Sequence, residues 1–600
     1  MGHRLNNGEG GAAPRAAAGS QPALPHWLSR LRRNETQLEI VLSVVIGALV
    51  GLVVVAFILL TGRLAARMYP SGGSGIRRIL LPTLGALGTG WLLYRYFPFA
   101  RGSGIPQTKF ALFINDGFIR FRTVVGKFFC CSASLASGIA LGREGPSVQI
   151  GAGLASVIAR RLGLPKERVR ALVPVGCSAA LAAAFNTPIA AVLFSLEEIM
   201  GDLNAPVLGS AVLASATSWM VLHLVLGDEP LFHVPAYHLV HSAEFAVYAA
   251  LGVVGGLGSV CFTKLLLWIR ARFALFPKNT AWLQPAAGGL GVGLMGFFVP
   301  GVLGVGYDIV ERALNGGMLL RVLIILAILK IVATALCYGS GNAGGIFGPA
   351  LFIGAMIGGA VGTVAHTWFP GLTAGPGAYA LVGMGTAFAG IVRTPMTSVI
   401  MIFEMTRDYS IIVPLMISNL IAFFISWKFQ RDPIYEALAH QDGVHLPQAR
   451  TRSEAAGMRV VEAMRPAPEP LSADMDVSLA AQRLRGEVLE SWPVADESGL
   501  LGMIRRVEVE AAVAWSEGTA RLRDLLDGTL TSGGLPSSEF PHVHLDHSLS
   551  LALERMGAAH VDVLPVVNRA NLRELLGIVT LNDVLRVYGV ENSAAPEDEP

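Results

Sequence analysis

The chain has 600 residues, of which 52% are hydrophobic and only 15% are charged, against roughly 25% charged residues in an ordinary soluble domain. This composition excludes a simple soluble protein and predicts a membrane protein. The formal net charge of +3 is small for the length and gives no reason to expect nucleic acid as a partner.

The N-terminal segment, residues 1–37, is rich in Gly, Ala, Pro and Arg and is predicted to be a disordered tail. Arg30, Arg32 and Arg33 directly precede the first apolar stretch, so the positive-inside rule places the N-terminus in the cytoplasm. The stretch 40–62 carries no charged residue and is long enough to span a bilayer, which takes about 20 apolar residues.

A dense series of apolar segments continues from residue 38 to residue 440. Between Ile331 and Val392 there is no Asp, Glu, Lys or Arg, and this run is too long for one span. Its many glycines and prolines predict several helices, some of them short or re-entrant. The five cysteines all lie in apolar stretches, which argues against a disulfide framework or a metal site.

Two blocks of this apolar region recur in the same order. The block that begins Gly145-Pro146 matches the one that begins Gly348-Pro349, and Thr187-Pro188 through Glu197 matches Thr394-Pro395 through Glu404, at offsets of 203 and 207 residues. A duplicated membrane unit is typical of transporters, whose substrate site lies where interrupted helices of the two halves meet. The repeat alone leaves open whether the halves are parallel or inverted.

Three stretches place glycines just before a proline that can open a helix: Gly102-Ser103-Gly104-Ile105-Pro106, Gly142-Arg143-Glu144-Gly145-Pro146 and Gly344-Gly345-Ile346-Phe347-Gly348-Pro349. Helix N-termini that converge on one point attract an anion through their unpaired amides and dipoles. Glu144 is itself an anion, so it can act as the gate or the competitor at such a site. The alternative is a Gly-Pro turn with a surface glutamate.

In this order, and followed by a soluble tail, the three stretches resemble the CLC family of chloride channels and chloride/proton exchangers over residues 38–440. The resemblance implies an α-helical polytopic membrane protein with two inverted-topology repeats and broken helices, a homodimer with one anion pathway per subunit. It also implies that chloride is bound by Ser103, by the backbone amides of Ile346 and Phe347, and by Tyr435 in Pro433-Ile434-Tyr435. Glu144 matches the gating glutamate.

The family resemblance also bears on the kind of transport. Exchangers carry a second glutamate near the cytoplasmic face that passes protons to the gating one, and the matching residue is Glu198. Glu197, whose repeat-equivalent is Glu404, is interpreted as structural. Coupled chloride/proton antiport is therefore predicted, with a passive voltage- or pH-gated chloride channel of the same fold as the alternative. Ser103 favours chloride over nitrate, and Gln107 stands where many relatives carry Glu.

Beyond residue 455 the pattern becomes mixed α/β. After a linker at 441–455, two similar units at 456–515 and 525–590 resemble a CBS-domain pair, followed by a tail at 591–600. Thr580 and Asp583 in Gly577-Ile578-Val579-Thr580-Leu581-Asn582-Asp583 match a run that binds ATP or another adenine nucleotide, whereas the first copy has Gly502, Arg505 and Glu508 at that spacing. A module for dimerisation and trafficking alone is the other reading.

Two other classes of protein also carry such tails. Divalent-cation transporters line their paths with acidic residues, which the long uncharged run argues against. An intramembrane metalloprotease needs His-Glu-x-x-His, and none of the 13 histidines provides it. The chain is therefore predicted not to be an enzyme, and to need no metal. The short loops suit a bacterial inner membrane, with both termini cytoplasmic and lipid as the surroundings.

Overall fold

The computed structural model describes residues 35–69, 74–203, 206–228, 230–235, 237, 239–444, 458–487, 489–515, 520–526 and 540–587. The chain divides into two compact units, Met1–Leu446 and Pro447–Pro600. The predicted tails at 1–37 and 591–600 and the predicted linker at 441–455 lie wholly or mostly outside the described residues. The first long helix begins at Glu35, slightly before the predicted start of the membrane region.

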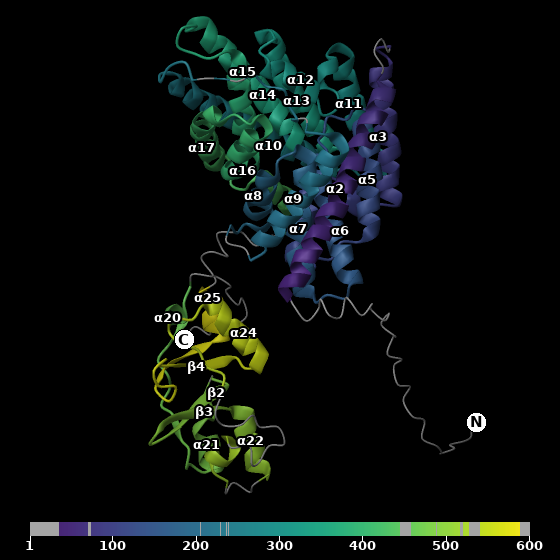
Figure 1. The fold of residues 1–600 in the computed structure, drawn as a ribbon. Helices are drawn as coiled ribbons and strands as arrows, with labels where there is room; N and C mark the ends of the chain where they lie inside the picture. Colours follow the sequence, from purple (N-terminus) through teal and green to yellow (C-terminus); the bar gives the residue numbers. More distant parts are fainter. Residues whose placement is uncertain are drawn as a thin grey trace, which may run out of the picture. The chain divides into compact units, whose positions relative to one another are not determined.

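The named elements of the first unit are all helices (Figure 1). Those of its first half are α2 (Glu35–Met68), α3 (Arg77–Arg95), η1 (Pro98–Ala100), α4 (Ile105–Phe113), α5 (Phe121–Ala136), α6 (Glu144–Arg161), α7 (Lys166–Phe185), α8 (Pro188–Phe194), the π-helical turn η2 (Ser195–Met200) and α9 (Leu208–Leu226). Those of its second half are α10 (Glu244–Ala274), η3 (Lys278–Thr280), α11 (Gln284–Phe298), η4 (Pro300–Val302), α12 (Tyr307–Leu314), α13 (Leu320–Gly339), α14 (Phe347–Trp368), α15 (Pro376–Val392), α16 (Pro395–Thr406), η5 (Tyr409–Ile411), α17 (Ile412–Phe429) and α18 (Ile434–Gln441).

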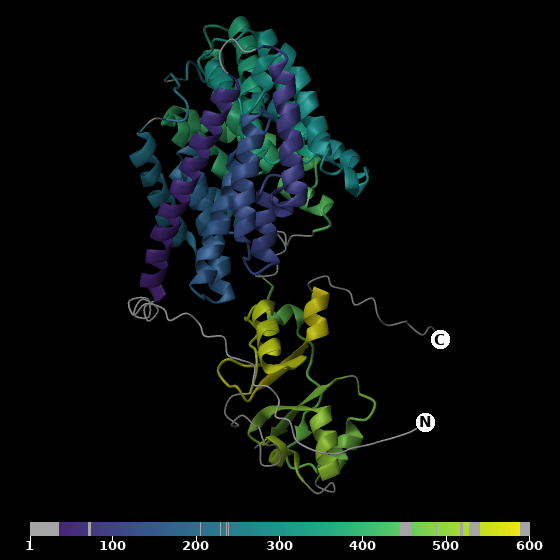
Figure 2. The same ribbon diagram turned by 90° about the vertical axis from the view of Figure 1, so that its right-hand side faces the viewer.

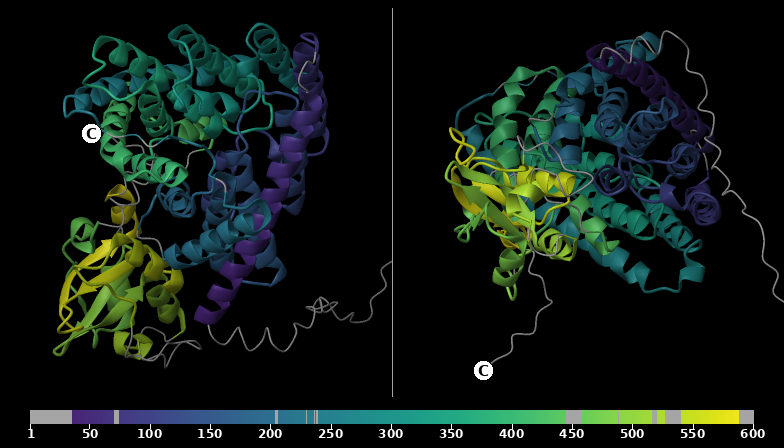
Figure 3. Two further views of the ribbon diagram at one scale, coloured as in Figure 1. Left: turned by 45° about the horizontal axis from the view of Figure 1, so that its top comes forward. Right: turned by 90° about the horizontal axis from the view of Figure 1, so that it is seen from below.

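Seven helical runs within the described ranges are long and apolar enough to cross a membrane, and α15 and α16 are shorter apolar helices. The uncharged run 331–392 contains the end of α13, all of α14 and all of α15, so the prediction of several helices is confirmed. The long helix α2, drawn in purple, lies at the edge of this helical unit in each of the views (Figure 3). It packs against α9, as α10 packs against α17.

The two halves repeat one another helix by helix. The pair α6 and α7 crosses at Gly151 and Gly176, where a Cβ on Gly151 would lie 2.3 Å from the Gly176 carbonyl oxygen. The pair α14 and α15 crosses in the same way at Gly354 and Gly383, with a corresponding distance of 2.2 Å. Only glycine permits such close backbone approach between membrane helices, so both crossings are fixed by sequence.

The break between α7 and α8 is also repeated between α15 and α16. Asn186 ends α7 with φ of 61°, and Arg393 ends α15 with φ of 68°. Each is followed by Thr-Pro, and the proline opens the next helix because its missing N–H is not needed there. The sequence repeat therefore encodes two equivalent interrupted helices.

The second unit contains two small α/β lobes (Figure 2). One holds β1 (Leu471–Ser472), α21 (Val477–Arg483), β2 (Ser491–Asp496), β3 (Gly499–Arg505), α22 (Arg506–Trp515) and α23 (Leu522–Leu526), and the other holds α20 (Val460–Ala463), α24 (Leu549–Ala559), β4 (Val563–Val567), β5 (Leu575–Thr580) and α25 (Leu581–Val587). The strand β1 pairs parallel with β2, and β2–β3 and β4–β5 pair antiparallel. Each lobe has its own apolar core, and the mixed α/β character predicted beyond residue 455 is confirmed.

Candidate functional site

Three glycine-rich loops are joined through their backbones in the middle of the first unit. Gly142 and Gly345 exchange two hydrogen bonds of 2.7 Å, and the Gly344 amide donates to the Gly102 carbonyl at 3.4 Å. Because these loops lead into α4, α6 and α14, the three helix N-termini lie together, as the sequence predicts. Gly142 and Gly345 are equivalent positions of the repeat, so the junction is symmetric.

Glu144 lies at this junction with its side chain fully buried. The Gly348 amide, in the first turn of α14, donates to its Oε2 at 3.2 Å, and the Tyr307 hydroxyl donates to its Oε1. Reading this glutamate as a surface residue of a Gly-Pro turn is therefore wrong. Pro146 is the third residue of α6 and not its first. A proline is tolerated there because the amides of the first turn have no intrahelical acceptor.

Ser103 and Tyr435 bring two hydroxyl groups to the same region. Both residues are fully buried, and their hydroxyls lie within reach of each other but have no other hydrogen-bond partner among the described residues. A buried hydroxyl without a partner is costly, so each such group calls for an explanation. Tyr435 also lies within electrostatic range of both Glu144 and Glu198.

The amides of Ile346 and Phe347 open α14. Within the described ranges, no protein group accepts a hydrogen bond from either amide. The Phe347 ring is held by other aromatic rings, with centroid distances of 4.6 Å to Phe185 and 4.3 Å to Phe388. The site thus offers two amides and two hydroxyls that are buried and available as donors, a set that fits an anion.

Glu197 and Glu198 are adjacent in the π-helical turn η2. Such an irregularity is frequent at functional sites. Glu198 is buried and forms an ion pair of 2.9 Å with Lys109 of α4, whose Nζ is also 3.8 Å from Glu436. Glu197 points elsewhere and accepts hydrogen bonds from Met396 and Thr397 at the start of α16. Adjacent residues of one turn therefore have separate partners.

Two buried lysines support the loops of the site. Lys127 donates to the carbonyls of Ala100 and Gly102, the latter at 2.6 Å. Lys330, its repeat-equivalent on α13, donates to Val302, Gly304 and Val305, with 2.6 Å to Gly304. Both ammonium groups therefore bind backbone carbonyls of the loops.

Sequence reasoning missed Tyr307, Lys109 and Glu436. The signal for Lys109 is a charged residue in an apolar helix three positions after Pro106, and an intramembrane charge is a functional candidate by default. Tyr307 carries no such signal. The Gln107 Oε1 accepts from the Gly104 amide at 2.9 Å, which caps α4.

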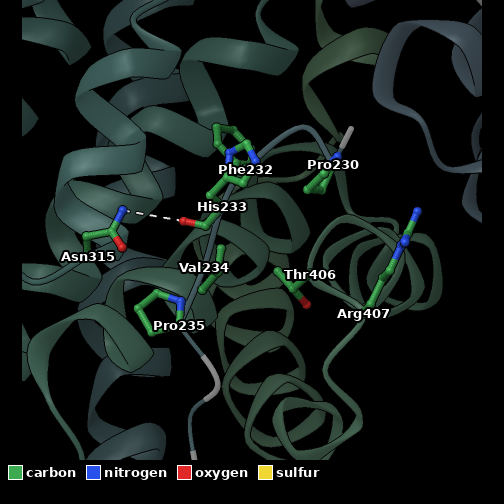
Figure 4. A pocket seen from close by; sticks show the side chains of 8 residues that line it. All are labelled: Pro230, Phe232, His233, Val234, Pro235, Asn315, Thr406 and Arg407. Atoms are coloured by element: carbon green, nitrogen blue, oxygen red, sulfur yellow. Dashed lines mark hydrogen bonds between the residues drawn. The ribbon is translucent and has the colours of Figure 1, made fainter. Parts of the chain in front are cut away.

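A pocket of about 340 Å³ lies beside α12 and α16 (Figure 4). It is lined by Pro230, Phe232, His233, Val234, Pro235, Asn315, Thr406 and Arg407. Asn315 fixes the lining segment by donating to the His233 carbonyl at 3.4 Å. The Phe232 ring packs edge-on against Tyr307 with a centroid distance of 5.5 Å, so this pocket adjoins the group that contacts Glu144.

In the second unit, Thr580 and Asp583 lie at the junction of β5 and α25. Asp583 accepts from the Thr580 hydroxyl at 2.6 Å and from Arg465 and Arg586 at 2.7 and 2.8 Å, and it is 4% exposed. Both carboxylate oxygens are thus already engaged by protein donors. At the equivalent spacing in the other lobe, Arg505 pairs with Glu508 at 2.5 Å.

Comparison with known proteins gives two family matches. Residues 84–427 match the model of the family described as voltage gated chloride channel, and residues 533–589 match the CBS domain. The chain is 33% identical over 360 residues to the H(+)/Cl(-) exchange transporter ClcA of Vibrio cholerae, which covers 58% of this chain and 76% of that protein. It is also 33% identical over 379 residues to a putative chloride channel protein ClcB-like of Ralstonia nicotianae, covering 62% and 88%.

Solved structures show the same fold. The crystal structure of a slow cyanobacterial Cl-/H+ antiporter matches with a TM-score of 0.62 and 26% identity, over 67% of this chain and 97% of that one. A eukaryotic CLC transporter matches with a TM-score of 0.59 and 22% identity, over 93% and 98%. With its duplicated helical unit, its joined helix N-termini and these matches, the chain belongs to the voltage gated chloride channel family, as a multi-pass membrane protein with a CBS domain in its second unit.

Proposed function

We propose that this protein is a coupled chloride/proton antiporter. The observation that carries the proposal is the placement of two buried glutamates near one donor-lined site. Glu144 accepts from the amide of Gly348, and Glu198 pairs with Lys109 within electrostatic range of Tyr435. The names of the relatives, an H(+)/Cl(-) exchange transporter and a Cl-/H+ antiporter, support the same activity.

Chloride is bound by the hydroxyls of Ser103 and Tyr435 and by the amides of Ile346 and Phe347. The two hydroxyls are buried and, among the described residues, have no protein partner other than each other, and the two amides open α14. Neutral donors suit a conducting site, because ion binding must be favourable enough to attract the ion and weak enough to release it. Lys127 and Lys330 contribute positive charge near the loops while their ammonium groups stay on backbone carbonyls.

Glu144 is the gating glutamate and the outer proton carrier. As a carboxylate it occupies an anion position on α14, where it competes with chloride. After protonation it loses the charge that held it there, leaves the position and admits chloride. Each proton that Glu144 takes up is therefore tied to anion movement in the opposite direction, and Glu198 exchanges that proton with the cytoplasmic side.

Reconstituted vesicles test this directly. A chloride gradient imposed across proteoliposomes drives proton movement against its own gradient in an antiporter, and chloride efflux and external pH are recorded together. Proton uptake that accompanies chloride efflux, and that disappears with Glu144→Ala and Glu198→Gln, supports the assignment. Chloride efflux that ignores the proton gradient in the unmodified protein contradicts it.

The ion pair between Lys109 and Glu198 favours a second candidate, a passive voltage- or pH-gated chloride channel of the same fold, because a carboxylate that stays bound to a lysine does not relay protons. The same recording separates the two candidates. A passive channel shows a reversal potential that depends on chloride alone.

The assembly and surroundings follow the family pattern. We infer a homodimer with one pathway per subunit, embedded in a bacterial inner membrane with both termini in the cytoplasm. The arginines at positions 30, 32 and 33 support this orientation. Cross-linking of the purified protein and protease accessibility in spheroplasts test the two statements.

The CBS unit is proposed to bind ATP or another adenine nucleotide at Thr580 and Asp583. A ribose hydroxyl has to replace Arg465 or Arg586 on the Asp583 carboxylate, so binding is expected to be weak. A nucleotide-dependent rise in melting temperature of the full chain, absent in Asp583→Ala, supports this site. A module that serves only dimerisation gives no such shift.

A further inference from the structure

Tyr307 contacts the gating glutamate and has no role in the mechanism above. It is the first residue of α12, and its hydroxyl donates to Glu144 Oε1. With the Gly348 amide on Oε2, each carboxylate oxygen has one donor. The two donors come from different helices, α12 and α14, so the carboxylate is held on two sides.

The position of the Tyr307 hydroxyl is set from several directions. Gly306 directly before it has φ of 83°, and a Cβ there would lie 2.7 Å from the Phe352 ring, so the turn into α12 requires glycine. Lys330 binds the carbonyls of Gly304 and Val305 and thereby fixes the preceding loop.

The Tyr307 ring is held between two side chains. Phe232 packs against it edge-on at 5.5 Å, and the Arg143 guanidinium lies 5.3 Å from its centroid. Both contacts involve the ring and not the hydroxyl. A phenylalanine at this position therefore keeps the packing and loses only the donor.

The Tyr307 hydroxyl differs in one respect from the Gly348 amide. The amide belongs to α14, the helix whose N-terminus serves the proposed anion site, so it suits chloride as well as carboxylate. The hydroxyl comes from α12 and reaches the carboxylate in the position where Glu144 closes the site. A donor of this kind stabilises the closed position and not the open one.

We propose that Tyr307 is a positioning residue that latches Glu144 in its closed position and thereby sets the rate of chloride passage. This rests on the proposed role of Glu144 as the gate. The other titratable or charged groups around the carboxylate are Arg143, with Nε 3.9 Å from Oε1, Cys131 on α5 and Tyr435 on α18, with Lys330 under the loop.

The test is chloride efflux from proteoliposomes. Tyr307→Phe is introduced into the unmodified protein and into the Glu144→Ala variant, and each is compared with its own background. Loss of a hydrogen bond to a charged group changes an equilibrium by about tenfold or more, so efflux near neutral pH is expected to rise by about tenfold or more. No rise is expected in Glu144→Ala, which has no carboxylate to hold.

Tyr379→Phe is the matched control. Tyr379 is also buried and donates to a buried carboxylate, Glu244, at 2.8 Å, but it lies outside the site. Efflux is expected to be unchanged in this variant. Tyr307→Met, which lacks the hydroxyl and is of similar length, provides a second variant and is expected to repeat the pattern of Tyr307→Phe.

Unchanged or slower efflux near neutral pH in both Tyr307 variants overturns the proposal. An equal change in the Glu144→Ala background also overturns it, since the hydroxyl then acts on chloride and not on the glutamate. Proton uptake in the same vesicles reports separately on antiport: chloride efflux without proton movement in the unmodified protein refutes the coupling while leaving the latch comparison intact.

Discussion

Glu197 and Glu404 cap each other's helices across the two halves of the repeat. Glu197, just after α8, accepts from the amides of Met396 and Thr397 at the start of α16, and Glu404, near the end of α16, accepts from Ile189 and Ala190 at the start of α8. Because the end of each helix lies against the start of the other, these two equivalent helices run antiparallel. The repeats are therefore inverted, a point that the sequence offsets left open.

This reciprocal contact predicts a stability effect without a transport effect. Glu197→Gln and Glu404→Gln each remove a carboxylate from a helix N-terminus, and hydrogen bonds to charged groups contribute about 1.5–3 kcal/mol. Each variant is expected to lower the melting temperature in detergent by a similar amount and to keep the proton-to-chloride ratio. A changed proton-to-chloride ratio in Glu197→Gln, but not in Glu404→Gln, would instead show that Glu197 takes part in proton transfer.

Glu144 is expected to separate the two ion fluxes. Glu144→Ala removes the group that fills the position on Gly348, so chloride efflux persists and proton uptake is abolished. The matched control is Glu244→Ala, another buried glutamate, which binds Tyr248 and Tyr379 away from the site. Coupled proton movement that survives in Glu144→Ala contradicts the gating role.

The ion pair of Lys109 and Glu198 predicts a rescue. Removing one partner of a buried pair costs about 3–5 kcal/mol because the other charge is left uncompensated. Lys109→Met is expected to destabilise the protein strongly, and Lys109→Met combined with Glu198→Gln is expected to recover most of the loss. Thermal unfolding of the unmodified protein, Lys109→Met, Glu198→Gln and the double variant gives the coupling energy of the pair. Additive effects would show that the pair contributes little to stability.

Tyr435→Phe is expected to weaken chloride binding without destabilising the fold. Within the described residues its hydroxyl lies within reach of the Ser103 hydroxyl and has no other protein partner, so little protein hydrogen bonding is lost with it. One hydrogen bond contributes about 0.5–1.5 kcal/mol, which corresponds to a two- to tenfold rise in the chloride dissociation constant. Isothermal titration with chloride measures it, and a Tyr379→Phe variant serves as the control at a buried tyrosine outside the site.

The sequence predicted those parts of the site that lie within short motifs of neighbouring residues. The three glycine stretches, Glu144 and the repeat could be read from neighbouring residues, and the helix breaks at Asn186 and Arg393 follow from Thr-Pro in both halves. Tyr307 and Glu144 are 163 residues apart, and Lys109 and Glu198 are 89 apart. Such pairings depend on how helices cross, which no short pattern records.

The site draws on the chain from Ser103 to Tyr435, and its loops are joined by backbone bonds between Gly142 and Gly345. During synthesis the loop at Gly142 therefore lacks its backbone hydrogen-bond partner until the loop at Gly345 has been made. A nascent chain released before residue 435 lacks one of the groups proposed to bind chloride. Under that proposal, anion affinity can serve as an assay of folding of the membrane unit.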